Sequence, residues 1–246
     1  MATSIRPLFR HHLAKKFIVQ NIPPRSKIVD IGCGRGDFDF WLAEYGYELE
    51  CFEFSEAAVE EFKKIWQKKQ LSNIKLRETD FFNYNQNPQA DVVMCFEVLE
   101  HIKEDGDAVE KMRQWLKPGG YLIISVPAHM SMWGKDDEVV GHARRYEKQE
   151  LNGLIEKAGL SVIQFYAYGF PWMNILKKIR EIQMKIKLPA KIGTKHSGVG
   201  FFKTDLFKFL FNSITFAPLI AFSKLFHKSD LAEGYFVVAK KNDASL

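Results

Sequence analysis

The stretch KIVDIGCGRGDF, residues 27–38, joins a short apolar strand to a run of glycines that leads into a helix. A glycine turn after a first strand lets backbone N–H groups approach a ligand closely, which is typical of nucleotide-binding and nucleoside-binding α/β folds. The glycines at 32, 34 and 36 are spaced GxGxG rather than GxGxxG, and Asp30 precedes them. This spacing favours a cofactor that lacks a pyrophosphate.

Apolar strands and helical segments alternate along most of the chain. The predicted strands are 27–31, 48–53, 74–78, 91–95, 121–126, 160–168 and 235–240, and the predicted helices are 8–20, 37–45, 56–69 and 147–158. Short apolar strands that alternate with helices favour a parallel sheet with helices on both faces. The sequence therefore predicts an α/β fold, a doubly wound, mostly parallel seven-stranded sheet of the Rossmann-like kind with a helical cap inserted before the last strand.

The chain divides into three predicted parts: an N-terminal helix in residues 1–24, a core formed by 25–168 and 232–246, and a basic, Phe-rich helical insertion in 169–231. Within the insertion, residues 174–228 hold eleven Lys and Arg against Glu181 and Asp205, a formal charge of +9 in a chain of +5. We expect this segment to cap the active site. The alternative is an interfacial element that contacts an anionic membrane peripherally.

Two acids follow the next strands of the predicted core. Glu53 ends the second strand, where a carboxylate can accept hydrogen bonds from ribose hydroxyls, and Asp80 follows the third. Asp80 can accept from an adenine amine while Phe81 packs on the purine face. Each acid alone is more often a solvated loop residue, but ligands of doubly wound sheets bind outside the carboxyl ends of the strands. The joint spacing therefore favours a nucleoside-containing cofactor.

The chain resembles the class I S-adenosylmethionine-dependent methyltransferases, particularly a branch with a VLEH motif after the fourth strand. The matching runs are VDIGCGRGDF at 29–38, ECFEFS at 50–55, ETDFF at 78–82, ADVVMCFEVLEHI at 90–102 and LKPGGYLIISVP at 116–127. The resemblance implies a transferase (EC 2.1.1.-) that uses S-adenosyl-L-methionine and releases S-adenosyl-L-homocysteine. It implies the following cofactor-binding residues: Asp30, Gly32, Cys33 and Gly34 at the methionine part, Glu53 at the ribose with Phe54 next to it in sequence, Asp80 and Phe81 at the adenine, and Phe96 and Glu97 at the floor of the site. His101 is expected to support the cofactor or to pack there, and catalysis is its less favoured role.

Residues 128–146 are rich in polar, aromatic and His residues without a clean period, which predicts a loop or lid. A general base assists methylation of a hydroxyl, and histidine suits that role at neutral pH. We therefore expect His142 to shape the acceptor site, with Asp136 or Arg145 orienting it. His129, directly after the fifth strand, is the second catalytic candidate, or else a polar lid residue. A W-G-x-D…G-H-x-R-R-Y run extends the resemblance to residue 160.

The predicted function is transfer of a methyl group to an O or N atom of a small-molecule, glycan or lipid-like acceptor. The alternative is a catalytically inactive cofactor-binding protein that serves as a regulator or partner. Nucleic acid is disfavoured as a substrate, because Cys95-Phe96-Glu97-Val98 replaces the (Asp/Asn)-Pro-Pro-aromatic run of amino-methylating enzymes. A Rossmann dehydrogenase is disfavoured by the GxGxG spacing.

The N-terminal residues carry several cations and lack the pattern of a signal peptide, so we expect a cytoplasmic protein. Peripheral contact with the inner membrane face is the alternative that the basic segment raises. The three cysteines, at 33, 51 and 95, are far apart and show no CxxC spacing. We therefore expect reduced thiols and no bound metal.

Overall fold

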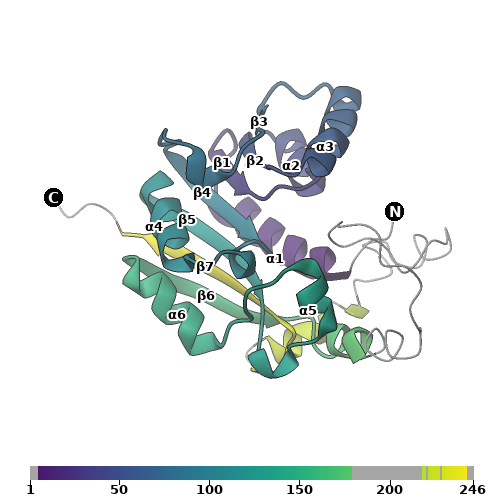
Figure 1. Ribbon diagram of the computed structural model, residues 1–246. Coiled ribbons are helices and arrows are strands. Elements are labelled where there is room, and N and C mark those ends of the chain that lie inside the picture. Colours follow the sequence, from purple (N-terminus) through teal and green to yellow (C-terminus); the bar gives the residue numbers. More distant parts are fainter. Residues whose placement is uncertain (1–4, 179–217, 220, 228, 243–246) are drawn as a thin grey trace.

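The computed structural model describes residues 5–178, 218–219, 221–227 and 229–242. Its centre is one seven-stranded sheet with the strand order β3-β2-β1-β4-β5-β7-β6 (Figure 1). The strands are β1 (Lys27–Ile31), β2 (Glu48–Phe52), β3 (Ile74–Arg77), β4 (Ala90–Phe96), β5 (Leu116–Pro127), β6 (Leu160–Tyr168) and β7 (Gly234–Lys241). Strands β1 to β5 pair in parallel, whereas β7 is antiparallel to both β5 and β6. The prediction of a mostly parallel seven-stranded sheet is confirmed.

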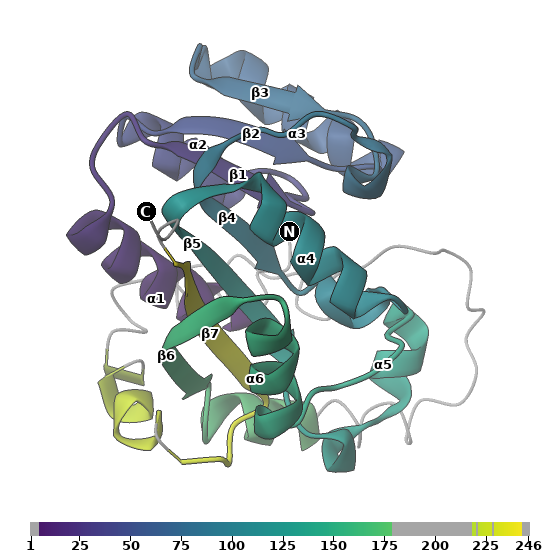
Figure 2. The same ribbon diagram turned by 90° about the vertical axis from the view of Figure 1, so that its left-hand side faces the viewer.

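Helices cover both faces of this sheet. They are α1 (Ile5–Asn21), α2 (Asp37–Glu44), α3 (Glu56–Lys69), α4 (Asp105–Trp115), α5 (Lys135–Val140) and α6 (Lys148–Lys157), with the short 3-10 helices η1 (Phe81–Asn83), η2 (Leu99–His101), η3 (Met130–Met132) and η4 (Lys224–Phe226). Figure 2 shows α1 on one face, and α4 and α6 on the other. This is the doubly wound arrangement that the alternation of strands and helices predicts.

Each face has its own buried apolar cluster. On one face Phe17 of α1, Phe40 of α2 and Phe62 of α3 pack over the sheet. On the other, Trp115 of α4 and Ile155 of α6 do so. Strands buried on both faces need apolar residues at successive positions, which explains why their sequences read as continuous apolar runs. The two clusters hold the carboxyl ends of the parallel strands in one row, where the site residues lie.

Two segments differ in detail from the sequence prediction. The predicted turn at 117–120 belongs to β5, where the pairing register with β4 shifts between Ala90 and Val92 and Gly119 has φ of +73°. The predicted lid at 128–146 contains η3 and α5, and its two ends, Ala128 and Tyr146, form a β-bridge. The lid is therefore a closed loop anchored at the carboxyl end of β5.

Most of the predicted cap (169–231) and of the basic segment (174–228) lies outside the described residues. Its described parts include a helical stretch at 172–178, which follows β6, and η4, which precedes β7. Within the described ranges, no helix combines the length and apolar character that crossing a membrane requires.

Candidate active site

The glycine turn after β1 is held in conformations that only glycine adopts freely. Gly32, Gly34 and Gly36 have φ of +72°, +58° and +75°. A Cβ on Gly32 would lie 2.3 Å from Val98 Cγ2, and one on Gly36 would lie 2.4 Å from the Phe62 ring, whereas one on Gly34 would meet nothing within 4 Å. Packing thus requires the outer two glycines. Gly34 instead faces open space, as a backbone that a ligand approaches should.

Glu53 ties this turn to the end of β2. Its carboxylate accepts hydrogen bonds from the backbone N–H groups of Gly34 (3.0 Å), Phe54 (2.9 Å) and Ser55 (2.8 Å). The side chain is nearly buried, while the Phe54 ring is 72% exposed. Three amide donors hold the Glu53 carboxylate at the position where the sequence predicts a ribose-binding acid.

Asp30 is a buried acid that faces a second one, Asp39 of α2. Burial and the nearby Asp39 carboxylate raise the pKa of Asp30 well above its ordinary value, and burial raises the pKa of Asp39 to about 6. In the described part of the chain, Asp30 Oδ1 is buried without a hydrogen-bond partner. A cationic ligand group such as an ammonium, which S-adenosylmethionine carries, would offset the Asp39 charge and stabilise the ionised form of Asp30.

Asp80 and Phe81 follow β3 as predicted, but they face different ways. Asp80 Oδ1 accepts the backbone N–H of Phe82 at 2.9 Å and so caps η1. The Phe81 ring is buried against Phe82 and Trp115, with ring centroids 4.4 and 6.0 Å apart. Phe81 therefore contributes mainly to the core, and its contact with a purine stays a prediction.

Helix α1 brings two cations, Arg6 and Arg10, that the sequence reasoning did not include. Arg6 Nη1 lies 3.5 Å from Glu97 Oε2, and the Arg10 guanidinium lies 5.9 Å from the centre of the Phe96 ring. Glu97 also accepts hydrogen bonds from the hydroxyls of Ser125 (3.0 Å) and Tyr168 (3.1 Å). Burial alone would raise the pKa of Glu97, but Arg10, Arg6 and these hydrogen bonds hold it below its ordinary value.

His142 follows α5 and is oriented by a carboxylate. Its Nδ1 lies 2.8 Å from Oδ1 of Asp137. The expected partner was Asp136, which instead pairs with Lys177 Nζ at 3.3 Å. Asp137 occupies the third position of α5, where its Oδ2 also accepts the N–H of Gly134 at 2.8 Å, so the helix turns Asp137 rather than Asp136 inward. The orienting acid is therefore one residue later than predicted.

Arg145 supports this pair without facing the surface. It is fully buried, its Nε donates to Asp137 Oδ1 at 2.9 Å, and its Nη1 donates to the carbonyl of Ala128 at 3.1 Å. Burial would raise the pKa of Asp137, but the hydrogen bonds from His142 and Arg145 hold it well below its ordinary value. Arg145 thus acts on His142 through Asp137, which makes it a positioning residue.

His129, directly after β5, has partners at both ring nitrogens. Nδ1 lies 3.1 Å from Glu147 Oε2, and Nε2 lies 3.3 Å from the Tyr235 hydroxyl and 3.5 Å from Asp230 Oδ1. The arrangement links the lid to the start of α6 and to β7. Because both ring nitrogens have partners, His129 is better interpreted as a polar lid residue than as a general base.

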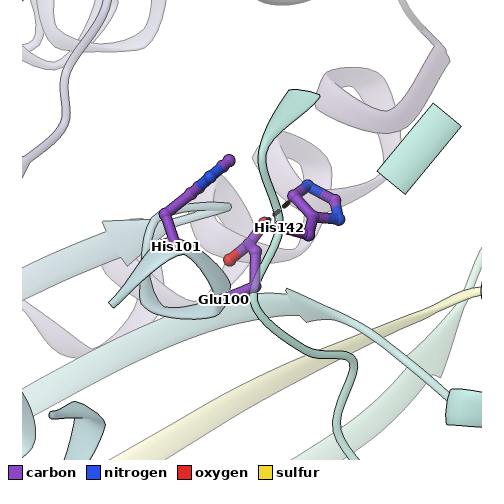
Figure 3. A group of neighbouring side chains, drawn as sticks. All are labelled: Glu100, His101 and His142. Carbon is purple, nitrogen blue, oxygen red and sulfur yellow. Dashed lines mark ion pairs between the residues drawn. The ribbon is translucent and has the colours of Figure 1, made fainter. Parts of the chain in front are cut away.

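Glu100 and His101 in η2 meet His142 at the end of β4, as Figure 3 shows. His101 Nδ1 lies 3.1 Å from the carbonyl of Gly141, and Glu100 Oε1 lies 3.7 Å from His142 Nε2. Glu100 is fully buried. Glu100 was not among the predicted site residues, because nothing in the sequence indicates that its side chain points inward.

Comparison with solved structures shows which class of protein this fold defines. A phosphoethanolamine N-methyltransferase from Haemonchus contortus, solved in complex with S-adenosyl-L-methionine, is similar with a TM-score of 0.64 and 18% sequence identity, covering 94% of this chain and 52% of that one. The fold is thus the Rossmann-like fold of S-adenosylmethionine-dependent methyltransferases. Asp30, Gly34 and Glu53 lie at the carboxyl ends of β1 and β2, the edge at which doubly wound sheets generally bind ligands.

Residues 7–165 match the family described as methyltransferase domain, and the chain belongs to this family. S-adenosylmethionine is its cofactor. Curated relatives include the ubiquinone biosynthesis O-methyltransferases of Acinetobacter baylyi, 27% identical over 41% of this chain and 43% of that protein, and of Coxiella burnetii, 30% identical over 45% and 47%. In these matches the chain spans less than half the length of the relatives.

Proposed function

We propose that this chain transfers a methyl group from S-adenosylmethionine to a hydroxyl oxygen of a small-molecule acceptor. The observation that carries the proposal is the convergence of two sets of groups at the carboxyl end of β4. Arg10 lies close enough to both Glu97 and Asp30 to favour the ionised form of each, and Glu100 Oε1 lies 3.7 Å from His142 Nε2. We infer that the cofactor binds on the Asp30 side of these groups and that the acceptor is activated beside His142. The names of the O-methyltransferase relatives support oxygen as the accepting atom.

The chain's own residues fit the cofactor. Asp30 would hold the ammonium of its methionine part, Glu53 the ribose, and Asp80 the adenine, with the Gly34 backbone providing close approach. When bound, S-adenosylmethionine supplies an electrophilic methyl group, and the bond from acceptor oxygen to methyl carbon forms as the methyl–sulfur bond breaks. Holding the acceptor in line with that bond is the protein's main task, and it lowers such barriers by roughly 7–11 kcal/mol in well-oriented cases.

A hydroxyl must also lose its proton, and His142 is placed to promote this loss. With Nδ1–H donated to the Asp137 carboxylate, the lone pair of the ring lies on Nε2. A base oriented in this way contributes about 10²–10⁴ in rate. Met130 of the lid has a half-exposed apolar side chain, and its Sδ lies 3.2 Å from the backbone nitrogen of Arg145. An apolar side chain in the lid suits an acceptor with an apolar portion.

Cofactor binding and methyl transfer are measured separately. Isothermal titration should show binding of S-adenosylmethionine and none of NADH. Incubation with methyl-labelled cofactor and panels of phenols, catechols, aliphatic alcohols and amines, read by mass spectrometry, should label hydroxyl acceptors. Cofactor binding without any labelling, repeated with a small-molecule cell extract, would favour the inactive cofactor-binding alternative. Labelling of amines alone would replace oxygen with nitrogen.

We also propose that the basic segment 174–228 rests on anionic lipid, an arrangement that suits an amphiphilic acceptor. The charge of +9 in this segment is the supporting observation. Co-sedimentation with vesicles containing an anionic lipid should occur at low salt and weaken at high salt. Absence of binding at low salt would remove this part of the proposal.

A further inference from the structure

Glu100, His101 and His142 come from two segments and gather at one point beside the end of β4 (Figure 3). Each side chain offers one potential ligand atom, and these atoms all lie within 4.8 Å of one another. Imidazole nitrogens and carboxylate oxygens are the common protein ligands of divalent first-row metals. The three side chains are therefore close enough together to be candidates for ligands of one metal ion.

Both imidazoles have the same nitrogen engaged. Nδ1 of His142 lies 2.8 Å from the Asp137 carboxylate, and Nδ1 of His101 lies 3.1 Å from the backbone carbonyl of Gly141. Because these acceptors require a hydrogen on Nδ1, the lone pair of each neutral ring is on Nε2. Metal-binding histidines almost always donate their other N–H to a carboxylate or a backbone carbonyl in this way. The supporting hydrogen bonds of a metal site are thus present.

The Glu100 carboxylate provides an independent observation. Its side chain is fully buried, and neither oxygen has a hydrogen-bond partner among the residues that the structure describes. The His142 ring nitrogen lies 3.7 Å from Oε1, beyond hydrogen-bond distance. An ionised carboxylate that is buried without partners is unfavourable, and a cation at this point would stabilise it.

We propose that Glu100, His101 and His142 bind one divalent cation of the Zn²⁺, Mn²⁺ or Fe²⁺ class. Two nitrogen ligands favour these metals over Mg²⁺ and Ca²⁺, which prefer oxygen. Ligand atoms at about 2.1 Å from a metal lie roughly 3–3.5 Å apart, so binding would draw the three side chains together by about 1 Å. Three protein ligands leave coordination positions open.

The open positions give the ion a role that rests on the proposed function. An acceptor hydroxyl that binds the cation would have its pKa lowered, as water does on zinc. Its proton then passes to bulk water, the oxygen forms its bond to the methyl carbon, and the electron pair of the breaking methyl–sulfur bond stays on sulfur. In this case His142 acts as a ligand rather than as a base.

Metal binding is tested on the full chain without a histidine tag and without cofactor or acceptor. The chain is first dialysed against EDTA, and the chelator is then removed. Titration with Co²⁺, monitored by visible absorption, should show one ion bound per chain, and Zn²⁺ should displace it. His101→Ala, His142→Ala and Glu100→Gln should each weaken binding at least tenfold. Asp137→Asn should weaken it about 10–100-fold, because it removes a hydrogen bond to a ligand.

His129→Ala is the matched control, because His129 is also a lid histidine with a carboxylate partner yet lies outside the cluster. It should bind the ion as the unmodified chain does. Circular dichroism of every variant ensures that lost binding is not lost folding, and Glu100→Gln, which keeps the shape of the side chain, serves where an alanine variant fails to fold. No stoichiometric binding by the unmodified chain, or equal binding by folded His101→Ala and Glu100→Gln variants, would overturn the metal site.

The two proposals fail in different ways. Stoichiometric metal binding in a chain that does not transfer methyl groups supports the ion site and contradicts the function. Transfer that is unchanged after chelation contradicts the ion's role and leaves His142 as the base. Transfer that falls at least tenfold on chelation and returns with Zn²⁺ or Mn²⁺ supports both proposals.

Discussion

Asp137 and His142 are joined by a hydrogen bond of 2.8 Å between Oδ1 and Nδ1, and the same carboxylate oxygen accepts from Arg145 Nε at 2.9 Å. One buried acid thus orients the imidazole and neutralises a guanidinium that is fully buried. The pair connects the stability of the lid with the chemistry of the site, because any change at Asp137 affects both.

Asp137→Asn should lower the free energy of unfolding by about 3 kcal/mol or more, since it leaves the buried Arg145 charge without its main partner. Asp136→Asn is the matched control. Asp136 contacts Lys177 at 3.3 Å and not the arginine, so its loss should cost about 1 kcal/mol. Urea denaturation of both variants measures the difference. Equal destabilisation by the two substitutions would show that Asp137 is not the main charge partner of the buried Arg145.

His142→Ala should reduce turnover well over tenfold and leave the dissociation constant for S-adenosylmethionine nearly unchanged, because the role proposed for the ring, which lies beside Glu100, is in acceptor activation. His129→Asn should change turnover only a few-fold, since both nitrogens of His129 already have partners. Steady-state kinetics and isothermal titration provide the two measurements. Unchanged turnover of a folded His142→Ala variant would reject its role.

Gly32→Ala and Gly34→Ala should have different effects although both glycines have positive φ. A Cβ at Gly32 would lie 2.3 Å from Val98 Cγ2, so that variant should lose about 3 kcal/mol of stability from strain and overpacking together. Gly34→Ala meets no neighbour and should lose only about 1 kcal/mol. It should instead weaken cofactor binding, because the methyl group projects toward the ligand. Thermal unfolding and titration distinguish the two.

Adding Val98→Ala to Gly32→Ala should restore part of the lost stability, because the contacting methyl group is then absent. No recovery would mean that backbone strain alone causes the loss.

Stability should depend on pH through the buried pair Asp30 and Asp39. The pKa of Asp39 is about 6 in the folded chain against 3.8 in its ordinary state, so the folded state holds more protons between those values. Stability due to this group is therefore complete below about pH 4 and is lost as the pH rises toward 6. Asp39→Asn should remove this loss and gain about 3 kcal/mol relative to the unmodified chain between pH 4 and 7.

Urea denaturation at intervals from pH 4 to 7 measures that gain. Glu44→Gln is the control, because Glu44 is also in α2 and exposed to water but is not among the charges that shift the pKa of Asp39. A pH profile of Asp39→Asn parallel to that of the unmodified chain would show that Asp39 does not hold its proton in the folded state.

The sequence was most informative where structure follows from local pattern. The strands at 27–31 and 160–168 and the helix at 56–69 have the predicted bounds, because apolar periodicity and helix-terminal residues act within a few positions. The lid was predicted as a loop, yet it contains α5, a helix of six residues. Its stability comes from contacts with distant residues such as Lys177, which no local pattern contains.

Only part of the candidate site could be predicted from the sequence. His142 was selected from its lid sequence, with Asp136 or Arg145 as the orienting residue. Asp137 was not considered, since only the packing of α5 against Arg145 decides which acid turns inward. Arg6 and Arg10 were counted only among the N-terminal cations that argue against a signal peptide. They reach Glu97 and Phe96 because α1 packs across the sheet.

By itself, the sequence determined the strand–turn–helix unit at 27–38 and the parallel core around it, because glycine conformations and apolar runs are local properties. It indicated the cofactor through the joint spacing of Asp30, Glu53 and Asp80 and through the resemblance to a known family. Only the tertiary structure decided the cluster of Glu100, His101 and His142, in which His101 meets a segment forty residues away. The sequence predicted no metal because it contains no compact ligand motif. The physical reason is that such a cluster depends on which segments the fold brings together, and here the packing of the lid against the end of β4 brings His142 to Glu100 and His101.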